Sequence, residues 1–398
     1  MTRCPPWETP MFKGLLVAAA LSLAIGSPAL AQPAPPQKAQ PQRAKNIIVF
    51  LADAGGVASV NAASLLGYGE PLKLHVQHWP NLGLSETSPV DQFVSDSANG
   101  MSAIMTGVKT RNGVISQSPA AVRGKTDGEP TKTLLEYAEA RGLRTGVVTS
   151  QPITDATPAA TYAHSNDRGK WGEIFQQAFT PRYGDGVDVL FGTGRARIGQ
   201  QLAAAGTGFD QIAKAHGRPI YARLEDAPAT NMRPVVVAEG EIDTRAATLR
   251  ALDLLKGSPK GYLLVVEWDA HTDDPREGLQ HIVDFDKLIA EIESRVDLKD
   301  TLLVFTADHS FGLQVDGGRR GEPLLEGYDA WKASQKPGGK DEDLIRLKNV
   351  MVNRSHTGEE VVALATGPGA ERVRGYFPNT HLFDVMMDAW GWKKDPAK

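Results

Sequence analysis

Cysteine is almost absent from this sequence, since Cys4 is the only one among 398 residues. A single thiol cannot form a disulfide within the chain or a zinc site built from several cysteines. Any metal ion must therefore be held by oxygen and imidazole ligands. Aromatic residues make up only 7% of the chain, and it contains no block of basic residues. We therefore expect no nucleic-acid-binding patch.

Neither sign of charge dominates the composition. The chain has 43 Lys and Arg residues against 47 Asp and Glu residues, which gives a formal net charge of −4. With 41% hydrophobic and 23% charged residues, the composition excludes a disordered or collagen-like chain. The length is sufficient for one large α/β domain or two ordinary ones.

The N-terminal segment has the pattern of an export signal. Residues 14–26 (GLLVAAALSLAIG) are apolar, and small residues in an A-x-A arrangement follow, ending at Ala31. This pattern predicts a signal peptide over residues 1–31. A membrane anchor is the alternative, but the run is too short to span a bilayer. We therefore expect a periplasmic or secreted protein with no membrane span, beginning with a disordered Pro/Gln-rich leader at residues 32–44.

From residue 45 onward, short apolar runs alternate with helical stretches. The runs lie at residues 46–52, 144–150, 187–193, 234–239, 262–267, 301–307 and 360–366. The helical candidates include residues 132–141, 243–256, 277–295 and 380–390. Runs that are apolar on both faces are typical of buried parallel strands. The sequence therefore predicts a doubly wound α/β fold, with a mostly parallel central sheet covered by helices on both faces. We expect one domain over residues 45–395, with a polar surface insertion at 318–349.

Three of the apolar runs end in acidic residues, and two of them have a histidine close behind. These residues are Asp53, then Glu267, Asp269 and His271, then Asp308 and His309. An acid after a strand is commonly a turn or cap residue. Three such ends meeting at one sheet edge favour a functional site instead. Asp and His are also the residues that bind zinc when no cysteine is available.

A candidate nucleophile lies in the segment VSDSANGMSAIMTGVKT, residues 94–110. Ser97 follows Asp96 and precedes a stretch of small residues that is suited to a helix. The N-terminus of a helix offers free N–H groups and a positive dipole end, which together favour a phosphate. The alternative is that Ser97 or Asp96 merely caps the helix. Spacing alone leaves both interpretations open.

Five sequence blocks together resemble the alkaline phosphatases, which are metal-dependent phosphomonoesterases with a serine nucleophile. The blocks are NIIVFLADAGG, DSANGMSAIMTGVKT, DATPAATYAHSNDR, TADHS and SHTGEEVVALATGPGA. They occur in the family order and extend the resemblance from about Asn46 to about Trp390. The resemblance implies small-molecule phosphate monoesters as substrates, with two Zn²⁺-type ions and one Mg²⁺-type ion as cofactors. Family members are often homodimers, so the resemblance also makes a homodimer an expectation.

The resemblance also implies a role for each matched residue. Ser97 matches the nucleophile that becomes a phosphoserine, and Arg168 matches the residue that clamps the phosphate. Asp53 matches a carboxylate that bridges two metals. Asp308 and His309 match ligands of the zinc that activates the serine. Each of these roles comes from the matched motif and not from spacing alone.

The remaining matched residues belong to the other two metal positions. Asp155 and Thr157 match ligands of the magnesium-type ion. His356 matches a ligand of the second zinc, which holds the water and the leaving group.

The segment after residue 262 departs from the family pattern, because Glu267, Asp269 and His271 are compressed into five residues. A deletion would leave Glu267 at the magnesium-type site, with Asp269 and His271 on the first zinc. An ungapped match would instead put Glu267 on the first zinc with His271. We prefer the deletion, because the family also has a strand that ends in Glu. The family's usual glycine after the bridging Asp53 is replaced here by Ala54.

Two other kinds of protein also fit the sequence. The same architecture hosts phosphodiesterases and other phosphate- or sulfate-ester hydrolases, and a fold does not fix a function. The compressed segment also leaves room for a metal- or phosphate-binding protein without catalysis. A serine at position 97 and the matched Arg168 favour the monoesterase.

Overall fold

The computed structural model describes residues 42–335 and 343–395. These residues belong to one compact unit, Pro41–Lys398. The predicted signal peptide, most of the predicted leader and part of the predicted insertion lie outside the described residues. Across the two described ranges, no helix is both long and apolar enough to cross a membrane.

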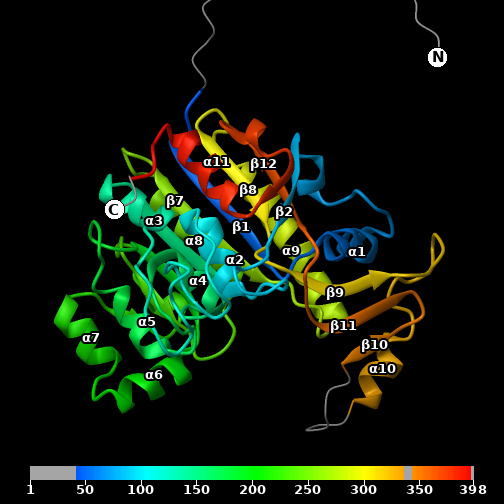
Figure 1. The fold of residues 1–398 in the computed structure, drawn as a ribbon, viewed down its shortest axis with the longest axis horizontal. Helices are drawn as coiled ribbons and strands as arrows, with labels where there is room; N and C mark the ends of the chain where they lie inside the picture. The colour runs from blue at the N-terminus through cyan, green and yellow to red at the C-terminus, as the bar shows by residue number, and fades with distance from the viewer. Residues whose placement is uncertain (1–41, 336–342, 396–398) are drawn as a thin grey trace, which may run out of the picture. The chain divides into compact units, whose positions relative to one another are not determined.

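A ten-stranded sheet forms the centre of the fold, with the order β13-β2-β12-β8-β1-β7-β3-β4-β6-β5 (Figure 1). Its strands are β1 (Asn46–Asp53), β2 (Asn81–Glu86), β3 (Arg144–Pro152), β4 (Val189–Thr193), β5 (Ile220–Tyr221), β6 (Val235–Val237), β7 (Tyr262–Asp269), β8 (Thr301–Thr306), β12 (Val361–Thr366) and β13 (Gly375–Pro378). Pairing is parallel throughout except at β12. The predicted doubly wound, mostly parallel α/β fold is therefore confirmed.

The direction of β12 corrects one expectation. Its apolar run, residues 360–366, suggested another parallel strand. β12 instead runs antiparallel to both of its neighbours, β8 and β2. Every residue of β12 is buried, and burial on both faces is needed by any interior strand, whatever its direction. The apolar run therefore predicts an interior strand correctly but cannot predict its orientation.

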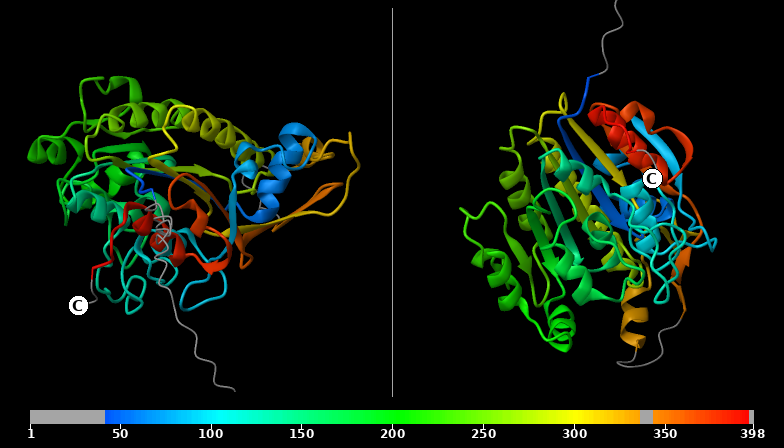
Figure 2. Two further views of the ribbon diagram at one scale, coloured as in Figure 1. Left: turned by 90° about the horizontal axis from the view of Figure 1, so that it is seen from above. Right: turned by 60° about the vertical axis from the view of Figure 1, so that its left-hand side comes forward.

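Helices cover both faces of the sheet, as Figure 2 shows. One face packs against α1 (Val57–Tyr68), α8 (Thr244–Leu255) and α9 (Pro275–Glu293). The other packs against α2 (Ser97–Thr106), α3 (Leu134–Ala140), α4 (Ala156–Tyr162), α5 (Trp171–Gln177), α6 (Arg195–Ala204), α7 (Phe209–His216) and α11 (Thr380–Trp390). Because strand side chains alternate between faces, Val49 and Leu51 of β1 enter one core while Ile48 and Phe50 enter the other. This double burial accounts for the apolar runs.

A second sheet lies between β8 and β12 in the chain. It consists of β9 (Ser310–Val315), β10 (Leu344–Arg346) and β11 (Val350–Thr357), in the order β10-β11-β9. The predicted insertion, residues 318–349, connects β9 to β11 and contains β10 and the short helix α10 (Tyr328–Ser334) (Figure 1). This second sheet begins directly after His309, and its last strand, β11, contains His356.

Helix α2 approaches the end of β8 closely because position 100 is glycine. A Cβ atom on Gly100 would lie 2.3 Å from the carbonyl oxygen of Asp308. Gly100 and Asp308 are both fully buried. A glycine at position 100 is thus a packing requirement, since it lets the N-terminal turn of α2 lie against Asp308.

Replacing Gly100 with alanine tests this contact. We expect Gly100→Ala to lower the free energy of unfolding by about 1–3 kcal/mol, because the added methyl group forces α2 and the Asp308 backbone apart. Gly199→Ala, in α6, is the matched control. Its Cβ would meet only the ring edge of Phe209, at 3.2 Å, and alanine favours the helix by up to ~1 kcal/mol. Urea unfolding of both variants measures the difference, and equal stabilities would contradict the close approach.

Candidate functional site

The predicted strand-end acids do lie together at one edge of the central sheet. β1 lies between β8 and β7, and its terminal Asp53 is in register with Asp269 of β7. A cavity of about 340 Å³ opens there. It is lined by Asp53, Ser97, Gln151, Asp155, Arg168, Asp269, His271, Asp273 and His356. Seven of these nine residues were predicted from the sequence.

The other four predicted residues lie behind the wall of this cavity. They are Thr157, Glu267, Asp308 and His309, and each is at most 1% exposed. The side chain of Thr157 donates a hydrogen bond to Asp308 Oδ2 at 3.3 Å. All eleven predicted residues therefore belong to one connected region.

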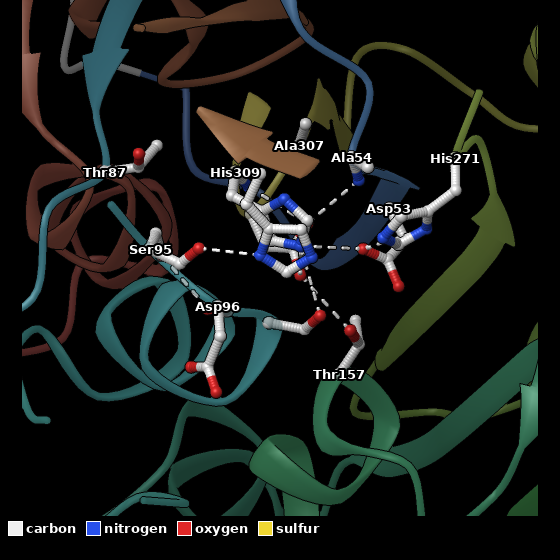
Figure 3. A network of polar contacts seen from close by, with 12 residues as sticks. Asp53, Ala54, Thr87, Ser95, Asp96, Thr157, His271, Ala307 and His309 are labelled. Carbon is white, nitrogen blue, oxygen red and sulfur yellow. Dashed lines mark hydrogen bonds and ion pairs between the residues drawn. The ribbon is translucent and has the colours of Figure 1, made fainter. Parts of the chain in front are cut away.

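His309 occupies the centre of the polar network (Figure 3). Its Nε2 lies 3.2 Å from Ser97 Oγ and 3.3 Å from Asp53 Oδ1. Its Nδ1 lies 3.2 Å from the carbonyl oxygen of Ser310, which can accept the Nδ1 proton. That contact leaves Nε2 as the nitrogen that faces Asp53 and Ser97.

Two further imidazoles complete a cluster around His309. The ring of His356 stacks on that of His309 with centroids 3.9 Å apart, and its Nδ1 lies 2.9 Å from the carbonyl oxygen of Ser95. His271 Nδ1 lies 2.8 Å from Asp269 Oδ1. A fixed second partner of this kind orients a metal-binding histidine and sets its tautomer.

The hydrogen bonds of Asp96 show which residue caps α2. Asp96 is the N-cap of α2 and accepts a hydrogen bond from the backbone N–H of Asn99 at 3.1 Å. Its other oxygen accepts from the backbone N–H of Gly113 at 2.8 Å. The capping role therefore belongs to Asp96, while the Ser97 hydroxyl is directed toward His309 and the cavity.

Arg168 is held at the cavity between two carboxylates. Its guanidinium donates to Asp155 Oδ1 at 3.0 Å and lies 3.4 Å from Asp96 Oδ2. Burial alone would lower its pKa, but the charges of Asp155 and Asp96 raise the pKa above the usual value. Arg168 therefore stays cationic and has a fixed direction. Asp155 faces Arg168 through Oδ1, and the family resemblance implies a metal-ligand role for the same residue.

The deepest acid of the site is Glu267. It lies on β7 in register with Leu51 and Thr149, and its Oε2 accepts a hydrogen bond from the hydroxyl of Thr149. Its Oε1 is buried and has no hydrogen-bond partner among the described residues. A buried carboxylate oxygen without a donor is costly unless a cation binds it.

The charges of these groups depend strongly on one another. Burial, followed by repulsion from Asp53, raises the pKa of Asp308 to about 6 and that of Glu267 well above its usual range. Burial would also raise the pKa of Asp53, but the positive charge of His271 and the contact with His309 hold it well below its usual value. Crowded carboxylates that cannot all ionise without positive charge nearby are a feature of metal sites.

The pKa values of His271 and His356 are shifted in opposite directions. Burial would lower the pKa of His271, but Asp53 and Asp269 raise it to about 10. Burial and then the charge of His309 lower the pKa of His356 to about 4. His356 is thus neutral at neutral pH, which is the form in which an imidazole binds a metal.

The donor atoms fit divalent cations in number, type and spacing. Three groups have all their candidate ligand atoms within 4.8 Å of one another. The groups are Asp53, Asp308 and His309; Asp53, Asp269 and His271; and His271, His309 and His356. Oxygen and imidazole ligands suit zinc, and the oxygen-rich region around the unpartnered Glu267 Oε1 suits magnesium.

Two lining residues and one pairing were not identified from the sequence. Gln151 directly follows an apolar run, so the rule that found Asp53 could also have found it. Asp273 lies two residues beyond His271. The pairing of Asp96 with Arg168 joins positions 72 residues apart and left no local signal.

Comparison with known proteins agrees with this geometry. The model of a family described as alkaline phosphatase matches residues 44–218 and 244–348, which include every predicted site residue except His356. A streptomycin-6-phosphate phosphatase from Streptomyces griseus is 29% identical, over 97% of this chain and 98% of that protein. An alkaline phosphatase from Drosophila melanogaster is 26% identical, over 87% of this chain and 76% of that protein.

Solved structures share the fold. An alkaline phosphatase from Thermus thermophilus has a TM-score of 0.72 at 22% sequence identity, covering 89% of this chain and 93% of that one. The alkaline phosphatase of the Antarctic bacterium TAB5 has a TM-score of 0.70 at 21% identity, covering 89% of this chain and 100% of that one. At these identities the likeness establishes the fold alone.

Ala54 connects the site to backbone strain. It follows Asp53 with φ of 66°, in the left-handed region, and its N–H donates to Asp308 Oδ1 at 3.3 Å. A residue with a Cβ is disfavoured there by about 1–2 kcal/mol. The glycine expected at this position from the family pattern would carry no such cost.

Restoring that glycine should stabilise the protein. We expect Ala54→Gly to raise the free energy of unfolding by up to ~1 kcal/mol, because relief of strain exceeds the entropy gained by the unfolded chain. Ala58→Gly, in the right-handed helix α1, should instead lower it by about 1 kcal/mol. Chemical denaturation of both variants gives the two signs, and a loss of stability in Ala54→Gly would contradict strain at this position.

Proposed function

The chain belongs to the alkaline phosphatase family, and from that membership and the geometry of its site we propose that it hydrolyses phosphate monoesters through a phosphoserine at Ser97. The observation that carries the proposal is the position of Ser97. Its Oγ lies at the start of α2, 3.2 Å from His309 Nε2, in a cavity that also presents Arg168. The same cavity therefore receives a hydroxyl nucleophile, a helix N-terminus that favours anions and a planar cation.

The acids and histidines would hold two zinc-type ions and one magnesium-type ion. Asp53, Asp308 and His309 would hold one ion. Asp53 would also be a ligand of the next ion, together with Asp269, His271 and His356. Glu267, Asp155 and Thr157 would hold the third. When bound, such ions stabilise the charge on the attacking and leaving oxygens of a phosphoryl transfer. The grouping of Asp269 with His271 and the depth of Glu267 support the deletion alignment over the ungapped one.

The chain's own residues account for the covalent steps. Ser97 Oγ attacks phosphorus, the bond to the ester oxygen breaks, and the alcohol leaves with a proton. Arg168 binds two phosphoryl oxygens as a planar fork, and Asp96 and Asp155 keep that fork in place. Water then attacks the phosphoserine, which releases inorganic phosphate and restores the Ser97 hydroxyl.

Two rival functions make different predictions. A phosphodiesterase or sulfate-ester hydrolase of the same architecture would prefer those esters in a panel of monoesters, diesters and sulfates. A binding protein without catalysis would bind phosphate stoichiometrically and turn over no ester. Arg168, held by two carboxylates, supports the monoesterase, because the dianion of a phosphate monoester is attracted to a fixed cation more strongly than the monoanion of a diester or a sulfate ester.

Export and assembly also remain proposals. The apolar run at residues 14–26 supports export to the periplasm or the medium, with cleavage after Ala31. Homodimer formation is expected from the family resemblance alone.

The phosphoserine can be trapped by acid quenching. We expect the wild-type protein, mixed with a phosphate monoester and quenched in acid, to gain the mass of one phosphoryl group on the peptide containing Ser97. Ser97→Ala should gain none and should lose activity by several orders of magnitude. Intact-mass and peptide mass spectrometry measure both outcomes.

Ser355→Ala provides the matched control. Ser355 is exposed and adjacent to His356, so its loss should leave both the phosphoryl adduct and turnover unchanged. Full activity in Ser97→Ala would refute the nucleophile assignment.

Metal binding should be visible in stability. In metal-free protein the raised pKa of Glu267 means that the folded state retains a proton that the unfolded chain releases, so stability falls as pH rises above the usual value of 4.5. Glu267→Gln removes this loss, so the metal-free variant should be at least as stable as wild type at pH 8. Adding Zn²⁺ and Mg²⁺ should raise the Tm of the wild type but raise that of the variant less.

Glu173→Gln serves as the control for this measurement. Glu173 lies on α5 with its side chain 69% exposed, so its metal-dependent rise in Tm should equal that of the wild type. An equal rise in Glu267→Gln would remove Glu267 from the metal site.

A further inference from the structure

A second cavity adjoins the catalytic one. It has a volume of about 270 Å³, which is the room taken by roughly nine water molecules in the liquid. Asp269, His271 and Asp273 line both cavities. We call this second cavity the annex. Ser97 and Arg168 do not line it, so the annex lies beyond Asp269 and His271 as seen from the nucleophile.

The outer wall of the annex comes from α10. Trp331 and Lys332 line the cavity from this helix. The helix is fixed to the start of α9, because Asp274 accepts hydrogen bonds from the Tyr328 hydroxyl at 2.7 Å and from Lys332 Nζ at 2.6 Å. The guanidinium of Arg276 lies 3.8 Å from the ring centroid of Tyr328. The wall is therefore a built surface and not a loose loop.

Not every charged residue that lines the annex has an ion-pair partner among the described residues. Asp274 is neutralised by Lys332, and Asp273 lies 3.6 Å from Arg354. Glu277 forms no ion pair and accepts no side-chain hydrogen bond within residues 42–335 and 343–395. The indole N–H of Trp331 is buried and likewise has no partner there. The annex thus offers the aromatic side chain of Trp331 and, among the described residues, one carboxylate without an ion-pair partner.

We infer that the annex is a leaving-group subsite for a hydroxyl-bearing, cationic ring, such as an amino-sugar phosphate. The inference rests on the proposed function, since in-line transfer to Ser97 Oγ expels the alcohol on the side of phosphorus away from the nucleophile. The indole would pack against the C–H face of the ring. Glu277 would face its ammonium group, and the two charges would then compensate each other.

Three phosphate esters distinguish the contribution of the ring from that of the ammonium group. Glucosamine 6-phosphate carries the ring and the ammonium, glucose 6-phosphate carries the ring alone, and ethyl phosphate is too small to reach the annex. We expect kcat/KM to fall in that order for the wild-type holoenzyme. The amine should be worth about two- to fivefold at low salt and less at high salt, because Glu277 is exposed.

Two variants then assign the residues. Trp331→Ala should lower kcat/KM for both sugar phosphates about three- to tenfold and leave that for ethyl phosphate unchanged. Glu277→Gln should remove the preference for glucosamine 6-phosphate over glucose 6-phosphate and leave the other two esters unchanged. Unchanged turnover of ethyl phosphate shows in each case that the variant is folded and that its catalytic centre is intact.

The results of these assays distinguish failure of the proposed function from failure of the annex assignment alone. Failure of the wild type to hydrolyse any of the three esters would overturn the proposed function, and the annex assignment with it. Hydrolysis of all three esters with equal kcat/KM would overturn the annex assignment alone. Equal losses on every ester in Trp331→Ala would also overturn it, because they would show that α10 supports the fold and not the leaving group. A preference for the amine that persists in Glu277→Gln would overturn the role of Glu277.

Discussion

The site depends on the mutual repulsion of carboxylates that the sheet forces together. Asp53 and Asp269 end two adjacent strands, Asp308 follows the end of a third, β8, and Glu267 lies two residues before Asp269 on β7. Burial, and then repulsion from Asp53, raises the pKa values of Glu267 and Asp308. Divalent cations remove the conflict, so the sheet topology itself creates the demand for metal.

A second constraint keeps Ser97 next to these acids. α2 can approach the end of β8 only because Gly100 lacks a side chain. Asp96 then serves two elements at once, since it caps α2 and also faces the guanidinium of Arg168. Ser97, Arg168 and the strand-end acids are therefore placed by one packed unit.

Much of this arrangement could be predicted from the sequence, because it follows from regular periodicity. Apolar runs predict interior strands, and parallel strands bring Asp53 and Asp308 to one edge. The direction of β12 could not be predicted, because burial is the same for either direction. β7 also extends two residues further than its apolar run, through Asp269. Glu267 and Asp269 therefore lie on the same face of one strand, one deep and one at the cavity, which compression in sequence alone did not reveal.

The segment between β8 and β12 has two parts in which substitutions would have different effects. At its base, Ser310 pairs with Thr357 and Phe311 pairs with His356, so the histidines are fixed by the junction with the main sheet. Its far part carries α10, whose Trp331 and Lys332 line the annex. Substitutions, insertions or deletions in α10 can therefore accumulate without moving His309 or His356. In this fold, selectivity can evolve independently of the reaction itself.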